Sequence, residues 1–507
     1  MKYIITNYYV IKVLHVSIES NSHIEQYVAL FVTNEKYPYL NDGVKTKRMS
    51  NASSISKRLD SLYEFDREPV SKNKLQGIGN FLGMYAGEHV AGTEFVIGML
   101  FVAHGVSVKD MFLGGLIGNI LAVGSWAFLT APIAVRVRLS LYWQLKKICG
   151  SKLVFIYNIV NALMFCFLAG AMVAVAATAV GIPFGIQMPS LQDLFPNSIG
   201  WVLTVLGVGM VITAMAILGF DALARFAKVA APWMFLIFVT GAIAVLPKLG
   251  ITPGASNFWE VARDNIWTGV ARDGQSQFSI WHVIFFSWLA NAAMHLGMSD
   301  LTILRYAKKW QYGFASAVGM FLGHYVAWIA SGILYAAANS DAPGVVAYEA
   351  IGIAGAICVV IAGWTTANPT LYRAGMALQV ASGWSRWRVT LLAGVITTTA
   401  AMFPALVMKL LDFVALYGLV LIPMGAVILA DFYIIPRLGL QQYYAEQKKI
   451  NFNLAAGATW FIMLTIALFV NFHFHVELYF LPVPIWIISL GTYILFSRLY
   501  QKPVKTE

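Results

Sequence analysis

Long stretches without an ionisable side chain recur along this sequence, and they constrain its fold more than any other feature. Eleven stretches of about 18 residues or more contain no Asp, Glu, Lys or Arg. At about 1.5 Å per residue, an α-helix of this length crosses the roughly 30 Å hydrocarbon core of a bilayer. Transmembrane helices are therefore predicted at residues 111–135, 153–192, 194–220, 229–247, 274–299, 310–340, 350–372, 389–408, 413–430, 450–476 and 478–497.

A twelfth span, the first in the chain, covers residues 75–108 but carries Glu88, His89 and Glu94. Ionisable side chains at this depth cost several kcal/mol, so they are found facing protein or a water-filled cavity. A glycine lies on each side of Glu88 and His89, which favours unwinding. We therefore expect two half-helices with free carbonyls between them. The alternative is a kinked helix in which Glu88 or His89 hydrogen-bonds to a neighbouring helix.

The composition agrees with a protein embedded in a lipid bilayer. Hydrophobic residues make up 59% of the 507 residues, charged residues 12%, and the mean hydropathy is +0.69. Soluble domains hold about a quarter charged residues. The net charge of +11 comes from basic residues between apolar stretches, so it indicates membrane topology and no nucleic-acid partner. The three cysteines, Cys149, Cys166 and Cys358, form no paired motif and are interpreted as packing residues.

Lysine and arginine are distributed unequally between alternate loops. If the N-terminus is cytoplasmic, about five basic residues lie in outside loops, three of them in one long loop whose charge has little influence on topology. We therefore expect a multi-pass protein of the cell membrane with both termini in the cytoplasm. The inside set consists of Arg136, Arg138, Lys146, Lys147, Lys152, Arg225, Lys228, Arg305, Lys308, Lys309, Arg373, Arg386, Arg388, Arg437, Lys448 and Lys449.

The chain divides into three predicted parts. Residues 1–70 are expected to form a poorly ordered cytoplasmic segment, because they lack steady periodicity and the features of a signal peptide. Met49 precedes a Ser/Asn-rich and then basic stretch, so we expect the native protein to start there and residues 1–48 to be an upstream extension. Residues 71–500 form the predicted transmembrane domain and 501–507 a cytoplasmic tail. A monomer is assumed.

The sixth span carries a second polar interruption. Residues 285–297 place Asn291, His295 and Gly297 near the middle of an otherwise apolar stretch, five spans after the first interruption. Discontinuous helices at corresponding positions of two halves are typical of transporters whose inverted repeats hold the substrate near the bilayer midplane. Glycine pairs at positions 114 and 118 and at 319 and 323 predict close helix packing.

The eighth span contains a proline that disturbs its backbone hydrogen bonds. Pro369 has no N–H, so the carbonyl of Thr365 loses its helical partner. Ala362 and Thr366 are four residues apart and share one helix face, so carbonyl and hydroxyl oxygens are expected to converge there. A small hard cation such as Na⁺ prefers such oxygens. The alternative is a kinked helix whose threonine hydroxyls bond back to the preceding turn.

Three patterns connect these spans with a known family. A Trp-Thr-Thr pattern begins at Trp364 and closes with Leu-Tyr, and Tyr-Gly followed by Pro-Met-Gly begins at Tyr417, with Ala-Asp-Phe-Tyr at Ala430. Asp-Leu-Thr at Asp300 is followed by Arg-Tyr at Arg305. These patterns resemble parts of the purine/cytosine permease family of nucleobase–cation symporters. The pattern at Trp364 resembles the family's eighth helix, and those at Tyr417 and Ala430 resemble its tenth helix and the exit from it. The pattern at Asp300 resembles the end of its sixth helix, with two extra residues before the arginine. The cytosine-permease branch is the most similar.

The resemblance covers about residues 75–500 and implies a fold, a function and a cation site. The implied fold is an all-α, LeuT-type membrane protein with a 5+5 inverted repeat and two C-terminal helices, about twelve in all. The implied function is symport of a small heterocyclic solute with Na⁺, or alternatively H⁺, by alternating access, without any organic cofactor. The family's cation site corresponds to Ala362, Thr365 and Thr366, with main-chain carbonyls in the first span placed at Glu88 and Ala91.

The expected substrate site departs from the family pattern. The family has a tryptophan in the third span where this chain has Phe165 and Phe167, and Glu88 and His89 replace small neutral residues. An aromatic sandwich from Trp288 and one of the two phenylalanines is expected to hold a flat ring. The departures favour a ring compound other than a plain nucleobase. The expected substrate contacts are His89, Phe165, Phe167, Trp288, Asn291, Trp364 and Asn368.

Two roles are open for Glu88. Its carboxyl group could accept hydrogen bonds from the solute, or it could carry a coupled proton. We favour the role as a ligand, because the two threonines already provide a Na⁺ site.

Other classes of protein fit the sequence less well. The chain has no His-Glu-x-x-His helix and no Gly-x-Ser-x-Gly elbow, so an enzyme is not expected. No repeated ring of charges indicates a channel. His473 and His475 beside Glu477 could bind a metal, but an interfacial cluster is favoured. An amino-acid symporter of the same fold stays open, although an acidic Glu88 would oppose a substrate carboxylate unless it were protonated or paired.

Overall fold

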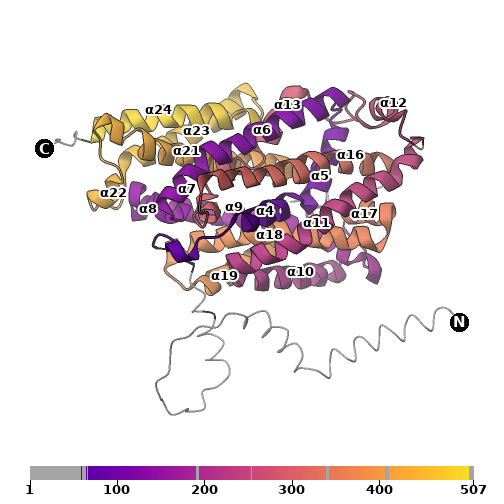
Figure 1. The fold of residues 1–507 in the computed structure, drawn as a ribbon, viewed down its shortest axis with the longest axis horizontal. Helices are drawn as coiled ribbons and strands as arrows, with labels where there is room; N and C mark the ends of the chain where they lie inside the picture. Colours follow the sequence, from indigo (N-terminus) through magenta and orange to yellow (C-terminus); the bar gives the residue numbers. More distant parts are fainter. Residues whose placement is uncertain are drawn as a thin grey trace, which may run out of the picture. The chain divides into compact units, whose positions relative to one another are not determined.

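The structure is a computed structural model that describes residues 59, 64–65, 67–189, 193–252, 254–338, 342–405 and 410–501. Every element in this part of the chain is a helix (Figure 1), apart from two isolated β-bridges that join Gln76 to Ala307 and Ser107 to Thr268. Residues 1–48, most of residues 49–70 and the tail from residue 502 lie outside the described residues. The expectations about these segments stay predictions.

The helices follow the order of the predicted spans. Spans 1 and 6 are divided into short helices, and spans 2 and 7 include π-helical or 3-10 segments. Spans 1 to 6 consist of α4 (Ile78–His89), α5 (Gly92–Ala103), η2 (Asp110–Gly114), α6 (Gly115–Ser125), η3 (Trp126–Thr130), α7 (Ala131–Val137), α9 (Ser151–Val180), α10 (Ile199–Ile217), α11 (Phe220–Val245), α13 (Ile280–Leu289), α14 (Ala292–His295) and α15 (Leu301–Leu304). Spans 7 to 12 consist of η7 (Trp310–Ala315), η8 (Val318–Tyr325), α16 (Val326–Ala337), α18 (Ile353–Ser382), α19 (Arg386–Ala401), α21 (Leu410–Tyr433), α23 (Leu454–Phe474) and α24 (Pro482–Tyr500). The connections carry α8 (Leu141–Cys149), α12 (Phe258–Val261), α17 (Pro343–Ile351) and α22 (Tyr444–Gln447).

Nine helical segments of the described residues are long and apolar enough to cross a membrane. The divided spans 1 and 6 and the 16-residue helix α19 complete the set of twelve predicted spans. The protein is therefore an all-α, multi-pass membrane protein, as the apolar stretches predict. The three cysteines are buried and unbonded to one another, which agrees with their interpretation as packing residues.

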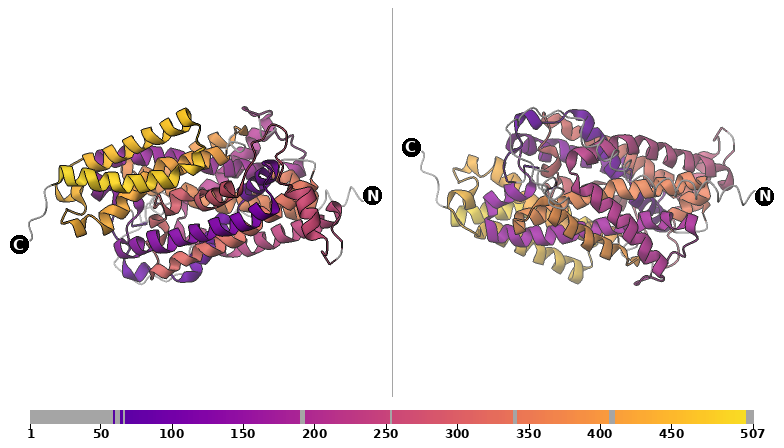
Figure 2. Two further views of the ribbon diagram at one scale, coloured as in Figure 1. Left: turned by 90° about the horizontal axis from the view of Figure 1, so that it is seen from above. Right: turned by 90° about the horizontal axis from the view of Figure 1, so that it is seen from below.

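Two sets of helices pack among themselves. Helices α9, α10, α18 and α19 form the first set; α4, α5, α6, α13, η8 and α16 form the second. Helix α11 contacts members of both. The C-terminal helices α23 and α24, drawn in yellow, pack on α21 at the edge of the bundle (Figures 1 and 2). Spans that are distant in sequence therefore meet where α4 and α5 lie against α18.

Both predicted interruptions are breaks in the helical backbone. Helix α4 ends at His89, and Ala91 is extended, with ψ 157°, before α5 begins. In span 6, Asn291 has ψ 27° between α13 and α14, and Met298 has a positive φ of 61° before α15. Both breaks lie inside the protein, since Val90 and Ala91 are buried at the first and Ala292 and Ala293 at the second, as a membrane interior requires of irregular backbone.

Close packing of η8 against the first break depends on glycine. A Cβ on Gly323 would lie 2.3 Å from the carbonyl oxygen of His89, and one on Gly319 would lie 2.6 Å from that of Tyr85. Gly118 in α6 approaches the carbonyl of Ile284 in α13 in the same way, at 2.5 Å. The predicted role of these glycines in close helix contact is confirmed.

The structure corrects the placement of one arginine. Arg373 was expected in an inside loop, but α18 continues past Tyr372 to Ser382, so Arg373 lies within this helix. Arg305 follows α15 and Arg386 begins α19, at the ends of their spans as expected, although both side chains are buried. Counting basic residues by loop fails for Arg373 because a buried guanidinium can be compensated by partners from other spans, which sequence distance does not reveal.

Candidate ion and substrate site

A cluster of oxygen atoms forms where the first break meets span 8. The hydroxyl of Thr366 lies 3.0 Å from the carbonyl oxygen of Glu88 and 3.0 Å from that of Ala362. The hydroxyl of Thr365 lies 3.1 Å from the same Ala362 carbonyl and 3.8 Å from the sulfur of Met234. Both hydroxyls are within donating distance of the Ala362 carbonyl in the preceding turn, as in the alternative of a kinked helix. The lone pairs that these hydroxyl and carbonyl oxygens keep have the chemistry of a site for a small hard ion.

Four of the five predicted cation residues are brought together in this cluster. The fifth, Ala91, lies in the break itself, and its carbonyl accepts a hydrogen bond from the amide of Glu94 at 3.1 Å. The backbones approach closely here, since a Cβ on Gly92 would lie 3.2 Å from the amide of Gly363. Pro369 lies inside α18, as expected for a helix with a freed carbonyl at Thr365.

The carboxylate of Glu88 belongs to a buried ion triad. Arg373 donates to both oxygens of Glu88, at 2.6 and 3.1 Å, and to Oδ1 of Asp300 at 2.5 Å. Spans 1, 6 and 8 each contribute one member. The exposed fractions of the three side chains are 5% or less. Bidentate contacts of this kind are the strong form of the ion pair.

Hydrogen bonds from other spans hold the triad in place. The other oxygen of Asp300 accepts from the Tyr85 hydroxyl at 2.9 Å and from the Trp126 indole at 2.6 Å. The Tyr142 hydroxyl donates to the Arg373 carbonyl at 2.9 Å. The pairing agrees with the alternative in which Glu88 bonds to a neighbouring helix. Neither of the two roles left open for the carboxyl group, solute ligand or proton carrier, included this ion pair, in which Arg373 donates to both carboxylate oxygens.

Sequence reasoning missed Arg373 and Asp300 as members of this site. Asp300 was noted only as part of a family motif, and Arg373 only as a basic residue after span 8. One signal was available: residues 374–382 are uncharged and mostly apolar or small, so the helix can continue past Arg373 and carry it into the protein.

Aromatic and imidazole rings surround the two breaks. His89 is 1% exposed and stacks on His324 of η8 with 5.0 Å between ring centroids. Trp126 lies 5.7 Å from the His89 ring and 4.6 Å from that of His295. His324 in turn stacks on Trp328 at 4.6 Å. These rings come from spans 1, 2, 6 and 7 and form an aromatic cluster.

Several ring nitrogens in the aromatic cluster have no hydrogen-bond partner in the part of the chain that the structure describes. They are Nε2 of His89, Nδ1 of His295 and Nδ1 of His324. The remaining nitrogen of His295 lies 3.0 Å from the Trp288 carbonyl, and Nε2 of His324 lies 3.1 Å from the amide nitrogen of Asn291. Buried polar atoms are normally paired, so unpaired ones at a functional site are candidates for ligand contacts.

The remaining predicted substrate residues do not meet at the breaks. Phe165 is buried against Tyr417, 5.1 Å between centroids, and Phe167 is 39% exposed beside Phe413. The indole of Trp288 donates to Ser125 in α6 at 3.0 Å. Trp288 makes no direct ring contact with either phenylalanine among the described residues, and the expected sandwich around a solute ring stays a prediction.

Trp364 and Asn368 face a different side of α18. The Trp364 ring packs 4.6 Å from that of Phe226 in α11. With its amide oriented to satisfy both partners, Asn368 donates to the Ile212 carbonyl at 2.9 Å and accepts from the Trp364 indole at 2.8 Å. This face of α18 is distinct from the one that carries Ala362 and Thr366, and it packs on α10 and α11.

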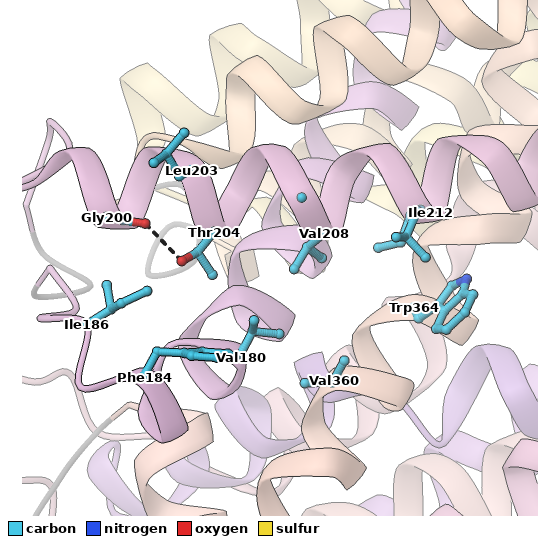
Figure 3. Close-up of a pocket in the computed structure, with 12 residues that line it drawn as sticks. Val180, Phe184, Ile186, Gly200, Leu203, Thr204, Val208, Ile212, Val360 and Trp364 are labelled. Atoms are coloured by element: carbon cyan, nitrogen blue, oxygen red, sulfur yellow. Dashed lines mark hydrogen bonds between the residues drawn. The ribbon is translucent and has the colours of Figure 1, made fainter. Parts of the chain in front are cut away.

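An apolar groove of about 600 Å³ lies along this side of α18 (Figure 3). Trp364 and Ile212 are at one end, and Phe184 and Ile186 are at the other. The groove is lined by Val180, Phe184, Ile186, Gly200, Leu203, Thr204, Gly207, Val208, Val211, Ile212, Val360 and Trp364. It includes neither the oxygen cluster nor the aromatic cluster.

The interpretation of His473, His475 and Glu477 as an interfacial cluster agrees with the geometry. Glu477 pairs with His282 at 3.0 Å and accepts from Tyr479 at 2.6 Å, and His473 stacks on Phe469. Within the described ranges, no group of three or more His, Cys, Asp or Glu side chains is arranged to hold a metal ion.

Solved structures of transporters share this fold. Mhp1, a nucleobase-cation-symport-1 family transporter in a closed conformation with bromovinylhydantoin bound, is 16% identical, covers 87% of this chain and 96% of its own, and has a TM-score of 0.67. A Na⁺-coupled sialic acid symporter in a substrate-bound outward-open state is 14% identical, with coverages of 89% and 95% and a TM-score of 0.63. MhsT in complex with L-phenylalanine is 15% identical, with coverages of 85% and 99% and a TM-score of 0.53.

No protein-family model matches the sequence, and no curated protein does. The likeness therefore lies in the three-dimensional arrangement. The similar structure with the highest of these TM-scores comes from the nucleobase–cation symporters, which the sequence motifs resemble. The chain has the LeuT-type fold that these transporters share, and the predicted fold class is confirmed.

Proposed function

We propose that this protein is a nucleobase–cation symporter that imports a small heterocyclic solute with Na⁺ by alternating access. It acts as a single chain in the cell membrane, with both termini in the cytoplasm. The observation that carries the proposal is the oxygen cluster at the first break, where Thr366 of span 8 contacts the carbonyl of Glu88 in span 1 and that of Ala362 in its own span. Such contacts bring neutral oxygens together at membrane depth, beside a broken helix, as cation-coupled transporters require.

The aromatic cluster supports a flat, polar ring as the solute. Imidazole and indole faces stack on heterocycles, and unpaired ring nitrogens can donate to or accept from the polar edge of the solute. His89, His295 and His324 supply such nitrogens between the two breaks. A plain hydrocarbon ring would leave them unsatisfied, which costs about 1–3 kcal/mol for each buried polar group.

Alternating access follows from the two sets of helices. The oxygen cluster joins α4 of one set to α18 of the other, so a cation there favours a particular arrangement of the two sets. Rocking of one set against the other would expose the site to one side of the membrane at a time. A cation and a solute that both stabilise the closed arrangement would be carried together.

Uptake into proteoliposomes tests this function. Labelled nucleobases, related ring compounds and amino acids are each offered with an inward Na⁺ gradient, with an inward proton gradient and with neither. We expect accumulation of a heterocycle that depends on the Na⁺ gradient. Accumulation driven by the proton gradient alone would show that the coupling ion is H⁺ and not Na⁺. The absence of gradient-driven uptake would reject symport of these compounds.

An amino acid is the second candidate solute. In the sequence, an acidic Glu88 spoke against an amino acid, because its charge would repel the carboxylate of the solute. In the structure, Glu88 is paired with Arg373. That objection is therefore weaker. The same panel separates the candidates, since a zwitterionic solute would compete with other amino acids and not with neutral heterocycles.

A further inference from the structure

Glu88 takes part in the oxygen cluster and in the ion triad at the same time. Its main-chain carbonyl lies 3.0 Å from Thr366 Oγ1, and its carboxylate accepts from Arg373 at 2.6 and 3.1 Å. The oxygen cluster and the ion triad are therefore linked through a single residue, with only the side chain of Glu88 between them. The oxygen cluster contains carbonyl and hydroxyl oxygens, which carry no formal charge and attract a cation only weakly.

The triad holds two carboxyl groups and one guanidinium. When both carboxyl groups are ionised, Glu88 and Asp300 contribute two negative charges and Arg373 one positive charge, which leaves one net negative charge on these buried side chains. A net charge at this depth costs several kcal/mol unless a counter-charge lies near it. A monovalent cation in the neighbouring oxygen cluster would be such a counter-charge.

We propose that the triad of Glu88, Arg373 and Asp300 supplies the negative charge that holds a monovalent cation in the neighbouring oxygen cluster. The inference rests on the proposed Na⁺ symport and assigns Arg373 and Asp300 a part in ion selection. A single positive charge neutralises the triad, whereas a divalent ion would leave one positive charge uncompensated. The triad therefore favours Na⁺ over Ca²⁺ or Mg²⁺ through charge, in addition to the size and number of the oxygens.

Equilibrium binding of labelled Na⁺ to the purified full chain tests whether affinity follows the net charge of the triad. Glu88→Gln and Asp300→Asn each bring that charge to zero, and each is expected to weaken Na⁺ binding at least about tenfold. Adding Arg373→Gln to either change restores one negative charge. These double variants are expected to bind Na⁺ within about threefold of the parent, because a net-charge effect is recovered by compensation.

Two further variants separate charge from architecture. Arg373→Lys keeps the charge but loses the bidentate contact, so Na⁺ affinity should be retained if charge decides. Asp431→Asn removes a buried carboxylate elsewhere, one that accepts from Tyr493 at 3.2 Å in the C-terminal half, and should leave Na⁺ affinity unchanged. Thermal unfolding of each variant identifies those that fold, and Na⁺ affinity is compared among these.

The outcomes distinguish this inference from the proposed function. A parent protein that binds no Na⁺ would refute Na⁺ symport and the role of the triad with it. A parent that binds Na⁺ while Arg373→Lys loses affinity, or while the double variants are as weak as the single ones, would refute the triad alone. In that case the geometry of the ion pairs, and not their charge, would shape the cation site.

Discussion

Two threonines one turn apart on α18 differ in what surrounds them. The hydroxyl of Thr366 reaches the Glu88 carbonyl on another span, whereas that of Thr370 donates to the Thr366 carbonyl of its own helix at 2.9 Å. Both are buried. The residue type and the helix are the same, so the comparison isolates the contact across spans that we assign to the ion.

Thr366→Ala removes one oxygen from the cluster. We expect it to raise the Na⁺ concentration for half-maximal uptake at least about tenfold, a loss of about 1.4 kcal/mol, while Thr366→Ser stays near the parent. Thr370→Ala is the matched control and should leave the Na⁺ requirement unchanged. Unaltered uptake by Thr366→Ala at limiting Na⁺ would remove this hydroxyl from the ion site.

His89 offers a second test at the scale of one side chain. His89→Phe keeps a flat ring against His324 and Trp126 but removes both ring nitrogens. We expect the solute concentration for half-maximal uptake to rise about tenfold, because a lost buried hydrogen bond costs about 1–3 kcal/mol, without any change in the Na⁺ requirement. His473→Phe, on the exposed end of α23, serves as the control. Equal solute affinity in His89→Phe and the parent would show that His89 only packs.

Among whole elements, the contact between α4 and η8 determines how the first break is held. Gly319 and Gly323 bring η8 against the backbone of span 1, and His89 and His324 stack across the same contact. A larger residue at one of these glycines should therefore push η8 away from α4 and disturb the first break, without changing any polar side chain.

Gly323→Ala is expected to destabilise this contact. Its Cβ would lie 2.3 Å from the His89 carbonyl oxygen, and overpacking of this kind costs about 1–3 kcal/mol. Gly491→Ala in α24 has open space around its Cβ and should keep or slightly raise stability, because alanine favours helix by about 0.5–1 kcal/mol. Thermal unfolding in detergent measures both. If the midpoint temperature of unfolding of Gly323→Ala equals that of the parent, η8 can move away from α4 without loss of stability.

At the scale of the whole molecule, the proposed orientation in the membrane rests on the basic residues of the loops. Arg373 lies within α18 and leaves the positive-inside count, but the remaining basic residues keep the same bias. The native cysteines are buried, so a single introduced cysteine on an exposed loop can report its side of the membrane.

Labelling by a membrane-impermeant maleimide tests the orientation. Asp273→Cys, in the exposed loop between spans 5 and 6, should react in intact cells. Lys309→Cys, in the exposed loop between spans 6 and 7, should react only after the membrane is permeabilised. The reverse pattern would place both termini outside and contradict the proposed orientation.

The sequence by itself determined the class of the protein, its spans and both helix breaks. Apolar stretches of membrane-crossing length leave an α-helix as the only local structure that satisfies its own backbone. Glycines beside Glu88 and His89, and Asn291 in span 6, mark the breaks because they disturb that structure locally. The cation residues of span 8 were predictable for the same reason, since Pro369, Ala362 and Thr366 act within two turns of one helix.

Only the tertiary structure decided which side chains from different spans share a site. Arg373 lies 285 positions from Glu88 and 73 from Asp300, and no local pattern specifies that one guanidinium serves both. Likewise, the sequence did not indicate that Asn368 would meet Ile212 of α10 or that Trp364 would pack on Phe226 of α11. Local sequence determines where each helix forms and in which direction its side chains point. Which residues these side chains contact depends on how the spans pack together, through contacts between residues that are far apart in the chain.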